Sequence, residues 1–192
     1  ATRGFGLLRS TNGGTSWPGI TPASTGNRIC DLEVRSTSGP GRLHVVMGIN
    51  SAQTYRYADN PETVTSASGW NAPVTAFPSY SQRAEIAVQG NVLYSLPSDN
   101  GGQTPNVYKS IDGGANWTVT PGPPPAIAGS SGAPFANTQG WYDLSVRINP
   151  ANADECIIGG VDCAKTTNGG TSWVTISAWL GTSGQYVHAD QH

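Results

Sequence analysis

The chain consists of short apolar runs separated by segments rich in Ser, Thr, Asn and Gly. Leu43 to Met47 and Ile86 to Val88 are two such runs, and no segment keeps the 3.6-residue apolar period of an amphipathic helix. Short runs bounded by turn-forming residues are typical of β-strands. The pattern therefore predicts an all-β fold in which helices are nearly absent.

One eight-residue pattern occurs three times, at Ser10–Trp17, Ser110–Trp117 and Thr166–Trp173. Each copy has a hydroxyl residue, then Asp or Asn, then two adjacent glycines and a final Trp. Repeats of about 50 residues are typical of propeller blades, and that period leaves room for one further copy between the first two. Residues 55–61, followed by Trp70, are interpreted as this degenerate copy.

The chemistry of the repeated pattern is that of a hairpin turn. Asp or Asn accepts backbone hydrogen bonds, glycine adopts positive φ where a Cβ would clash, and the Trp packs beside the turn. We therefore expect a structural role rather than a metal or phosphate site. The residues expected to form these turns are Ser10, Asn12, Gly14, Trp17, Ser110, Asp112, Gly114, Trp117, Thr166, Asn168, Gly170 and Trp173.

The three segments resemble the Asp-box, or bacterial neuraminidase repeat, which reads Ser-x-Asp-x-Gly-x-x-Trp. Ser110–Trp117 matches this pattern completely, whereas Asn12 and Asn168 replace the Asp and Thr166 replaces the Ser. The resemblance implies a β-propeller with blades of four-stranded antiparallel sheets. It also implies that the turns join the outer strands of each blade, away from the ligand-binding face.

The spacing of the repeats predicts a partial propeller. Because propeller rings usually contain about four to eight blades and this chain accounts for about three and a half, we expect the remaining blades in the same or another chain, and favour a longer polypeptide. The predicted blades are 1–28 (partial), 29–82, 83–140, 141–186 and 187–192, the last being the start of another blade.

A second alignment groups the carboxylates Asp31, Glu85, Asp143 and Asp190 in one column. The first three belong to segments interpreted as the innermost strands of successive blades: Ile29–Val34, Arg83–Val88 and Trp141–Val146. Two roles remain open for the column. The carboxylates either cap backbone amides of the adjacent blade, or they bind a cation or glycan or provide the acid and base of glycoside hydrolysis.

Two further groups are candidate ligand-binding residues. Trp141 and Tyr142 either stack on a sugar face or pack beside the channel. His188, Asp190 and His192 alternate, so a strand would direct all three to one face, as a metal site with two histidines and one carboxylate requires. The alternative is that they line the channel entrance and hydrogen-bond to neighbouring strands.

Cys156 and Cys163 flank Gly159-Gly160, and a two-residue turn there would set the two cysteines opposite each other. The spacing permits a disulfide or two free thiols. Cys30 has no evident mate.

Composition limits the partners. Charged residues make up 11% of the chain and the net charge is −2, so a basic surface for nucleic acid is not expected. No apolar run approaches the roughly 20 residues that span a bilayer, and no cofactor motif is present. The small share of Lys and Glu favours a secreted or cell-surface protein.

Two functions are therefore considered. The leading hypothesis is a non-catalytic extracellular propeller segment for adhesion, glycan or protein binding, or surface assembly. The alternative is part of a secreted glycoside hydrolase, because Trp-Tyr-Asp, Gly-Gly and His-x-Asp-x-His sequences resemble those of bacterial xyloglucanase-like propellers. That resemblance makes Asp143 and Asp190 the candidate catalytic residues. Arg147–Pro150 departs from the Arg-Ile-Pro motif of sialidases by an inserted Asn.

Overall fold

The computed structural model describes residues 4–22, 28–35, 41–123, 135–180 and 185–191. Within these ranges the chain forms three antiparallel sheets and no helix, as the sequence pattern predicts. The first sheet has the order β1-β2-β3, the second β4-β5-β6-β7 and the third β8-β9-β10-β11. Consecutive strands in the chain are therefore neighbours in each sheet, which is the simplest antiparallel arrangement.

The first sheet contains β1 (Ile29–Arg35), β2 (Arg42–Met47) and β3 (Thr54–Ala58). Four strands were predicted, but the described residues of this sheet continue beyond β3 only as an isolated bridge between Tyr57 and Asn71. The long turn between these two residues lacks the paired glycines of the other copies, so the chain returns to the sheet for a single residue pair.

The second and third sheets each have four strands. Their strands are β4 (Arg83–Gln89), β5 (Val92–Ser98), β6 (Val107–Ser110), β7 (Thr118–Thr120), β8 (Ser145–Asn149), β9 (Asn152–Gly159), β10 (Cys163–Thr166) and β11 (Val174–Thr175).

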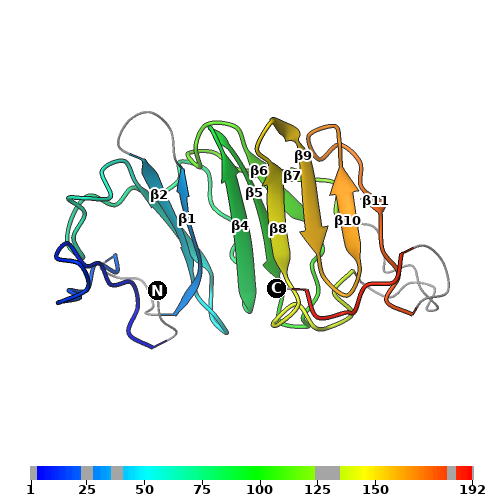
Figure 1. Ribbon diagram of the computed structural model, residues 1–192, viewed down its shortest axis with the longest axis horizontal. Helices are drawn as coiled ribbons and strands as arrows, with labels where there is room; N and C mark the ends of the chain where they lie inside the picture. Colours follow the sequence, from blue (N-terminus) through cyan, green and yellow to red (C-terminus); the bar gives the residue numbers. More distant parts are fainter. Residues whose placement is uncertain (1–3, 23–27, 36–40, 124–134, 181–184, 192) are drawn as a thin grey trace.

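The first strands of the three sheets lie next to one another. β1 packs beside β4, and β4 packs beside β8 (Figure 1). Apolar side chains fill the space between consecutive sheets: Val46, Tyr55 and Ile86 lie between the first and second, and Leu96 and Ile158 between the second and third. Burial of one such side chain contributes about 1.5–3 kcal/mol, so the contact between sheets is a main source of stability.

The two ends of the sheets differ. β4 begins at Arg83, opposite Ser98, and reaches the other end at Gln89, opposite Val92. We call the end where β1, β4 and β8 begin the strand-start end. Ser110 pairs with Leu93, so the turn after β6 lies at the opposite end, which we call the box end. Thr166 pairs with Cys156 in the same sense in the third sheet.

The turn 110–117 joins β6 to β7 and is held by short internal hydrogen bonds. The Asn116 amide N donates to Asp112 Oδ1 (2.9 Å), the Gly114 amide N donates to Ser110 Oγ (2.9 Å), and Trp117 Nε1 donates to the Gly114 carbonyl (3.1 Å). The φ angles of Gly113 and Gly114 are 72° and 88°, in the region that favours glycine. The sequence therefore forms this turn through its own side chains.

The turns 10–17 and 166–173 repeat the bonds to the hydroxyl residue and to the Asp position, where they have Asn. In the third turn, Trp173 Nε1 has no hydrogen-bond partner among the described residues. Ser16 N donates to Asn12 Oδ1 (3.0 Å), and Ser172 N donates to Asn168 Oδ1 (3.0 Å). The Asn amide nitrogens in turn donate to the hydroxyls of the same two serines, at 2.8 and 2.9 Å. Asn thus keeps the acceptor that the turn needs. We call these three segments (10–17, 110–117 and 166–173) the box turns.

The predicted register of the cysteines is wrong. Cys163 pairs with Gly159 and Cys156 pairs with Thr166, so the two cysteines are not opposite each other. The turn has three residues, because Gly160 N donates to the Asp162 carbonyl (2.9 Å) and Val161 is buried against residue 135. Cys30, Cys156 and Cys163, all within the described ranges, are free thiols. Burial raises the pKa of Cys156 to about 12, which keeps that thiol protonated.

Two predicted strands differ from the structure. β8 begins at Ser145 rather than at Trp141, because the backbone amides of Tyr142 and Asp143 both donate to the Gln139 carbonyl (2.8 Å) and form a turn. Residues 185–191 contain no strand, so the alternation expected for His188 and Asp190 is not seen.

Candidate functional site

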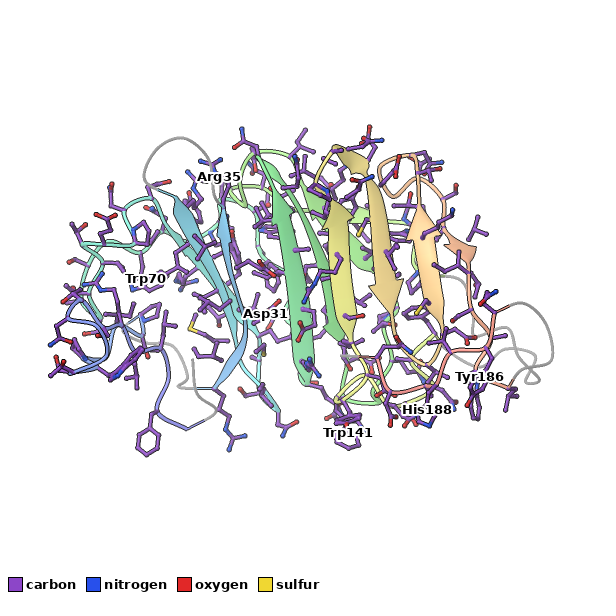
Figure 2. The ribbon with its side chains drawn as sticks, viewed as in Figure 1. Asp31, Arg35, Trp70, Trp141, Tyr186 and His188 are labelled. Carbon is purple, nitrogen blue, oxygen red and sulfur yellow. The ribbon has the colours of Figure 1, made fainter. Side chains whose placement is uncertain are left out.

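Three large aromatic side chains are exposed near the strand-start end. Trp141 is 58% exposed, Tyr142 41% and Tyr186 62%. The rings of Trp141 and Tyr142 lie 5.5 Å apart between centroids and are tilted by 44°. Figure 2 shows Trp141, His188 and Tyr186 along one edge of the molecule, far from Arg35 at the other end of β1. The pair formed by Trp141 and Tyr142 is an exposed apolar surface of the kind that marks binding sites.

The turn that carries Trp141 and Tyr142 is fixed to the second sheet by Arg83. The guanidinium of Arg83 donates from Nη1 to the Tyr142 carbonyl (2.6 Å). Its Nε and Nη2 atoms both donate to Glu85 Oε1, at 2.8 and 2.6 Å. Because one guanidinium bonds both the carboxylate and the carbonyl, the position of the aromatic turn depends on the start of β4.

Asp31 connects the first sheet to the second. Its Oδ2 atom accepts a hydrogen bond from the Ile86 amide N (2.8 Å), and its Oδ1 atom accepts one from the Leu32 amide N (2.7 Å). The first bond crosses from β1 to β4. This is the capping of a neighbouring blade that the sequence suggested as a structural role for the column.

Glu85 is buried beside Asp31. Burial, followed by the negative charge of Asp31, raises the pKa of Glu85 to about 8, although the Arg83 guanidinium acts to lower it. Burial and the charge of Asp31 also raise the pKa of Glu33, whose Oε1 lies 3.9 Å from Arg147 Nη1. The first strands therefore share a partly buried cluster of carboxylates balanced by two arginines.

The two candidate catalytic aspartates lie in different surroundings. Asp143 is completely buried before β8, whereas Asp190 is exposed and its Oδ2 lies 3.5 Å from His188 Nδ1. Glycoside hydrolysis needs two carboxyl groups that both reach the scissile bond. As placed here, only Asp190 reaches solvent.

A metal site is not assembled by the part of the chain that the structure describes: no group of three or more His, Cys, Asp or Glu side chains is placed to hold an ion there. His188 and Asp190 are close to each other, and the third predicted ligand, His192, lies outside the described residues.

Three residues of this site, Arg83, Arg147 and Tyr186, were not predicted from the sequence. Arg83 and Glu85 lie two positions apart on one strand, and such positions share a face, so the pair was detectable in principle. Arg147 was treated only as part of a motif. Tyr186 directly precedes the segment that contains His188 and Asp190. Of the predicted residues, Asp31 and Glu85 are brought together, and Trp141 and Tyr142 are brought together.

No helix long and apolar enough to cross a membrane occurs among the described residues. No protein-family model matches the chain, and no curated protein matches it significantly.

Solved structures with a similar fold do exist. An ancestral GH74 enzyme has a TM-score of 0.60 and 19% identity, and the match covers 90% of this chain and 21% of that one. The NanB sialidase from Streptococcus pneumoniae has a TM-score of 0.52 and 15% identity, covering 82% of this chain and 25% of that one. YCF48 bound to D1 peptide has a TM-score of 0.51 and 15% identity, covering 78% and 39%.

These structures are similar to the chain in fold, and the chain spans less than two fifths of the length of each. Their identities are too low to transfer an activity, because one fold supports many functions. Together with the three antiparallel sheets, they show that the chain forms part of a β-propeller.

Proposed function

We propose that the chain is a non-catalytic segment of an extracellular β-propeller that binds a glycan at its strand-start end. The observation that carries this proposal is the exposed pair of Trp141 and Tyr142, held in place by Arg83. Aromatic rings bind sugars by stacking against the apolar face of the pyranose, and fixed rings lose little entropy when they do so.

The carboxylates support binding rather than hydrolysis. Asp31 uses both carboxylate oxygens to accept backbone hydrogen bonds, and Glu85 is paired with Arg83. Asp143 is buried. Each of these groups therefore has a structural setting. Asp190 and His188, at the same edge of the molecule as Trp141, remain as exposed polar side chains that can bond to sugar hydroxyls (Figure 2).

An extracellular location fits this proposal. The small share of charged residues and the resemblance to secreted propellers support it, and a glycan at a cell surface or in a cell wall is the ligand class that such a protein meets. The further blades of the ring would complete the binding face.

The test measures the affinity of the protein for xyloglucan, a soluble β-glucan, by isothermal titration calorimetry. Trp141→Ala is expected to weaken binding about 30-fold or more, because an aromatic residue at the centre of a binding site contributes about 2 kcal/mol or more. The circular dichroism spectrum should remain unchanged, since Trp141 is more than half exposed.

Trp17→Ala is the matched control, because Trp17 is also exposed, at 57%, but belongs to a box turn. This variant is expected to bind xyloglucan as the unmodified protein does. Equal losses in the two variants, or no binding by the unmodified protein to xyloglucan or other β-glucans, would exclude the proposed site.

The alternative function is a glycoside hydrolase, and one observation favours it. A carboxylic acid that stays protonated near neutral pH, such as Glu85 with its pKa of about 8, beside a second carboxylate, such as Asp31, is the arrangement of a general acid and its partner. Glu85 is buried and paired with Arg83, so it reaches a substrate only if this ion pair opens.

A further inference from the structure

The box turns serve as contacts between consecutive sheets. Between the first and second sheets, Trp117 packs edge-on against Tyr55, with ring centroids 5.2 Å apart. Arg42, on β2, donates from Nη1 to the Gly113 carbonyl of the same box turn (2.7 Å). The box turn of the second sheet thus contacts a tyrosine and an arginine of the first sheet.

The contact between the second and third sheets follows the same plan. Trp173 packs edge-on against Tyr94, with centroids 6.3 Å apart. Lys109, on β6, donates from Nζ to the Gly169 carbonyl (3.1 Å) and lies 3.4 Å from Asp154 Oδ1. Again the indole packs against a tyrosine, and again a cationic side chain donates a hydrogen bond to a glycine carbonyl.

The third sheet has the equivalent cation on its outer face, with Ile157 in place of the tyrosine, and none of the described residues covers them. Lys165 directly precedes the third box turn, as Lys109 directly precedes the second. Lys165 pairs with Ile157, as Lys109 pairs with Tyr94. Arg147, Ile157, Lys165 and Val174 form one exposed row across β8, β9, β10 and β11.

A cavity lies within this row. It has a volume of about 350 Å³, which is enough to take an aromatic side chain. Its lining includes Ile157 as apolar surface and Arg147 and Lys165 as cations, all from the exposed row. Ile148 and Cys156 also line it, but they alternate with this row, and their side chains pack in the core on the opposite face. The opposite face of the same sheet, with Val146, Ile158 and Ala164, is buried against the second sheet.

We propose that a further box turn, carried by the next blade of the same polypeptide, packs against this exposed face. The indole of that turn enters the cavity beside Ile157, and one of its glycine carbonyls accepts a hydrogen bond from Lys165 Nζ. Both contacts already described join sheets that are consecutive in one chain, so the same rule assigns this occupant to the same chain. The inference does not depend on the glycan proposal.

The test uses the two lysines of the chain, Lys109 and Lys165. The native protein is treated with an amine-acetylating reagent, and acetylation of each lysine is followed by mass spectrometry of its peptides against the denatured protein. Lys109 is the internal standard, because its side chain is only 15% exposed under the third box turn. Lys165 is expected to be acetylated at least about tenfold more slowly in the native protein than in the denatured protein, as Lys109 is. Even a small free energy of local opening gives protection of this size.

Dilution distinguishes a box turn of the same polypeptide from a box turn of a second copy. Protection of Lys165 that is independent of protein concentration supports a blade of the same polypeptide. Protection that disappears on dilution indicates a second copy and overturns the proposal, as does a Lys165 that reacts at its denatured rate while Lys109 stays protected.

A variant tests the apolar part of the proposed contact. Ile157→Asp places a charge where the indole would pack, so it should raise acetylation of Lys165 about tenfold towards its denatured rate and leave Lys109 protected. Val119→Asp, at an exposed position of β7 in the second sheet, is the control and should leave both lysines protected. Unchanged protection of Lys165 in Ile157→Asp contradicts the assigned contact.

Discussion

Two box turns with nearly the same sequence differ in what surrounds them. In both 110–117 and 10–17 the Trp Nε1 donates to the carbonyl of the second glycine, at 3.1 and 3.0 Å. Yet Trp117 is 6% exposed and Trp17 is 57% exposed. The motif therefore specifies the turn locally, whereas the preceding sheet decides whether its Trp belongs to the core.

The surroundings of Trp117 explain the difference. Its ring lies edge-on to Tyr55 and Phe77, with centroids 5.2 and 5.1 Å away, and both rings belong to residues that precede the second sheet. Such edge-to-face contacts add about 0.5–1.5 kcal/mol to the burial of the rings. A box turn is thus stabilising mainly as a contact between blades.

The largest expected effect comes from deleting each indole. Trp117→Ala should lower the free energy of unfolding by about 3–5 kcal/mol, the usual cost of removing a buried aromatic side chain. In a protein of these 192 residues, Trp17→Ala should lower it by less than about 1 kcal/mol, because substitutions of exposed residues have small effects. Equilibrium denaturation in urea measures both losses. Equal losses would show that the contact with the preceding sheet does not decide how much the Trp contributes to stability.

A smaller effect is expected from adding one methyl group at the second glycine of each turn. Gly14 and Gly114 have φ angles of 91° and 88°, so Ala at either position costs about 1–2 kcal/mol of backbone strain. At Gly114 the new Cβ would also lie 1.8 Å from Tyr55 Oη, whereas at Gly14 the nearest atom is 3.9 Å away.

Gly114→Ala should therefore destabilise the protein by about 1–3 kcal/mol more than Gly14→Ala does, which is the usual cost of overpacking. Thermal denaturation of the two variants compares them. If both variants lose the same stability, Tyr55 is not held against the turn, and the account of the contact between the first two sheets is wrong.

Local sequence patterns predicted the parts of the fold that depend on local chemistry. The box turns, the absence of helices in the described residues and the strands that contain Asp31 and Glu85 are of this kind. The alignment of these two carboxylates also led to the bond from Asp31 to the next strand, because equivalent positions of adjacent first strands lie close together.

Two of the failures lie where a tertiary contact sets the local structure, and the late start of β8 comes from a local turn. One extra residue in the turn after Gly159 changes the register of Cys163, and it is held by a contact of Val161 with residue 135 that no local pattern reveals. β8 begins after Trp141 because residue 139 forms a turn there. The role of Arg83 depends on a carbonyl 59 positions away in the chain.

The central claim is that the strand-start end binds a glycan without cleaving it. The most direct measurement incubates the protein with xyloglucan and determines both the bound polysaccharide and the new reducing ends in the same samples. The account predicts bound xyloglucan, lost in Trp141→Ala, and no new reducing ends. Reducing ends that accumulate with the protein and disappear in Asp143→Asn, Asp190→Asn or Glu85→Gln would contradict it and establish hydrolysis instead.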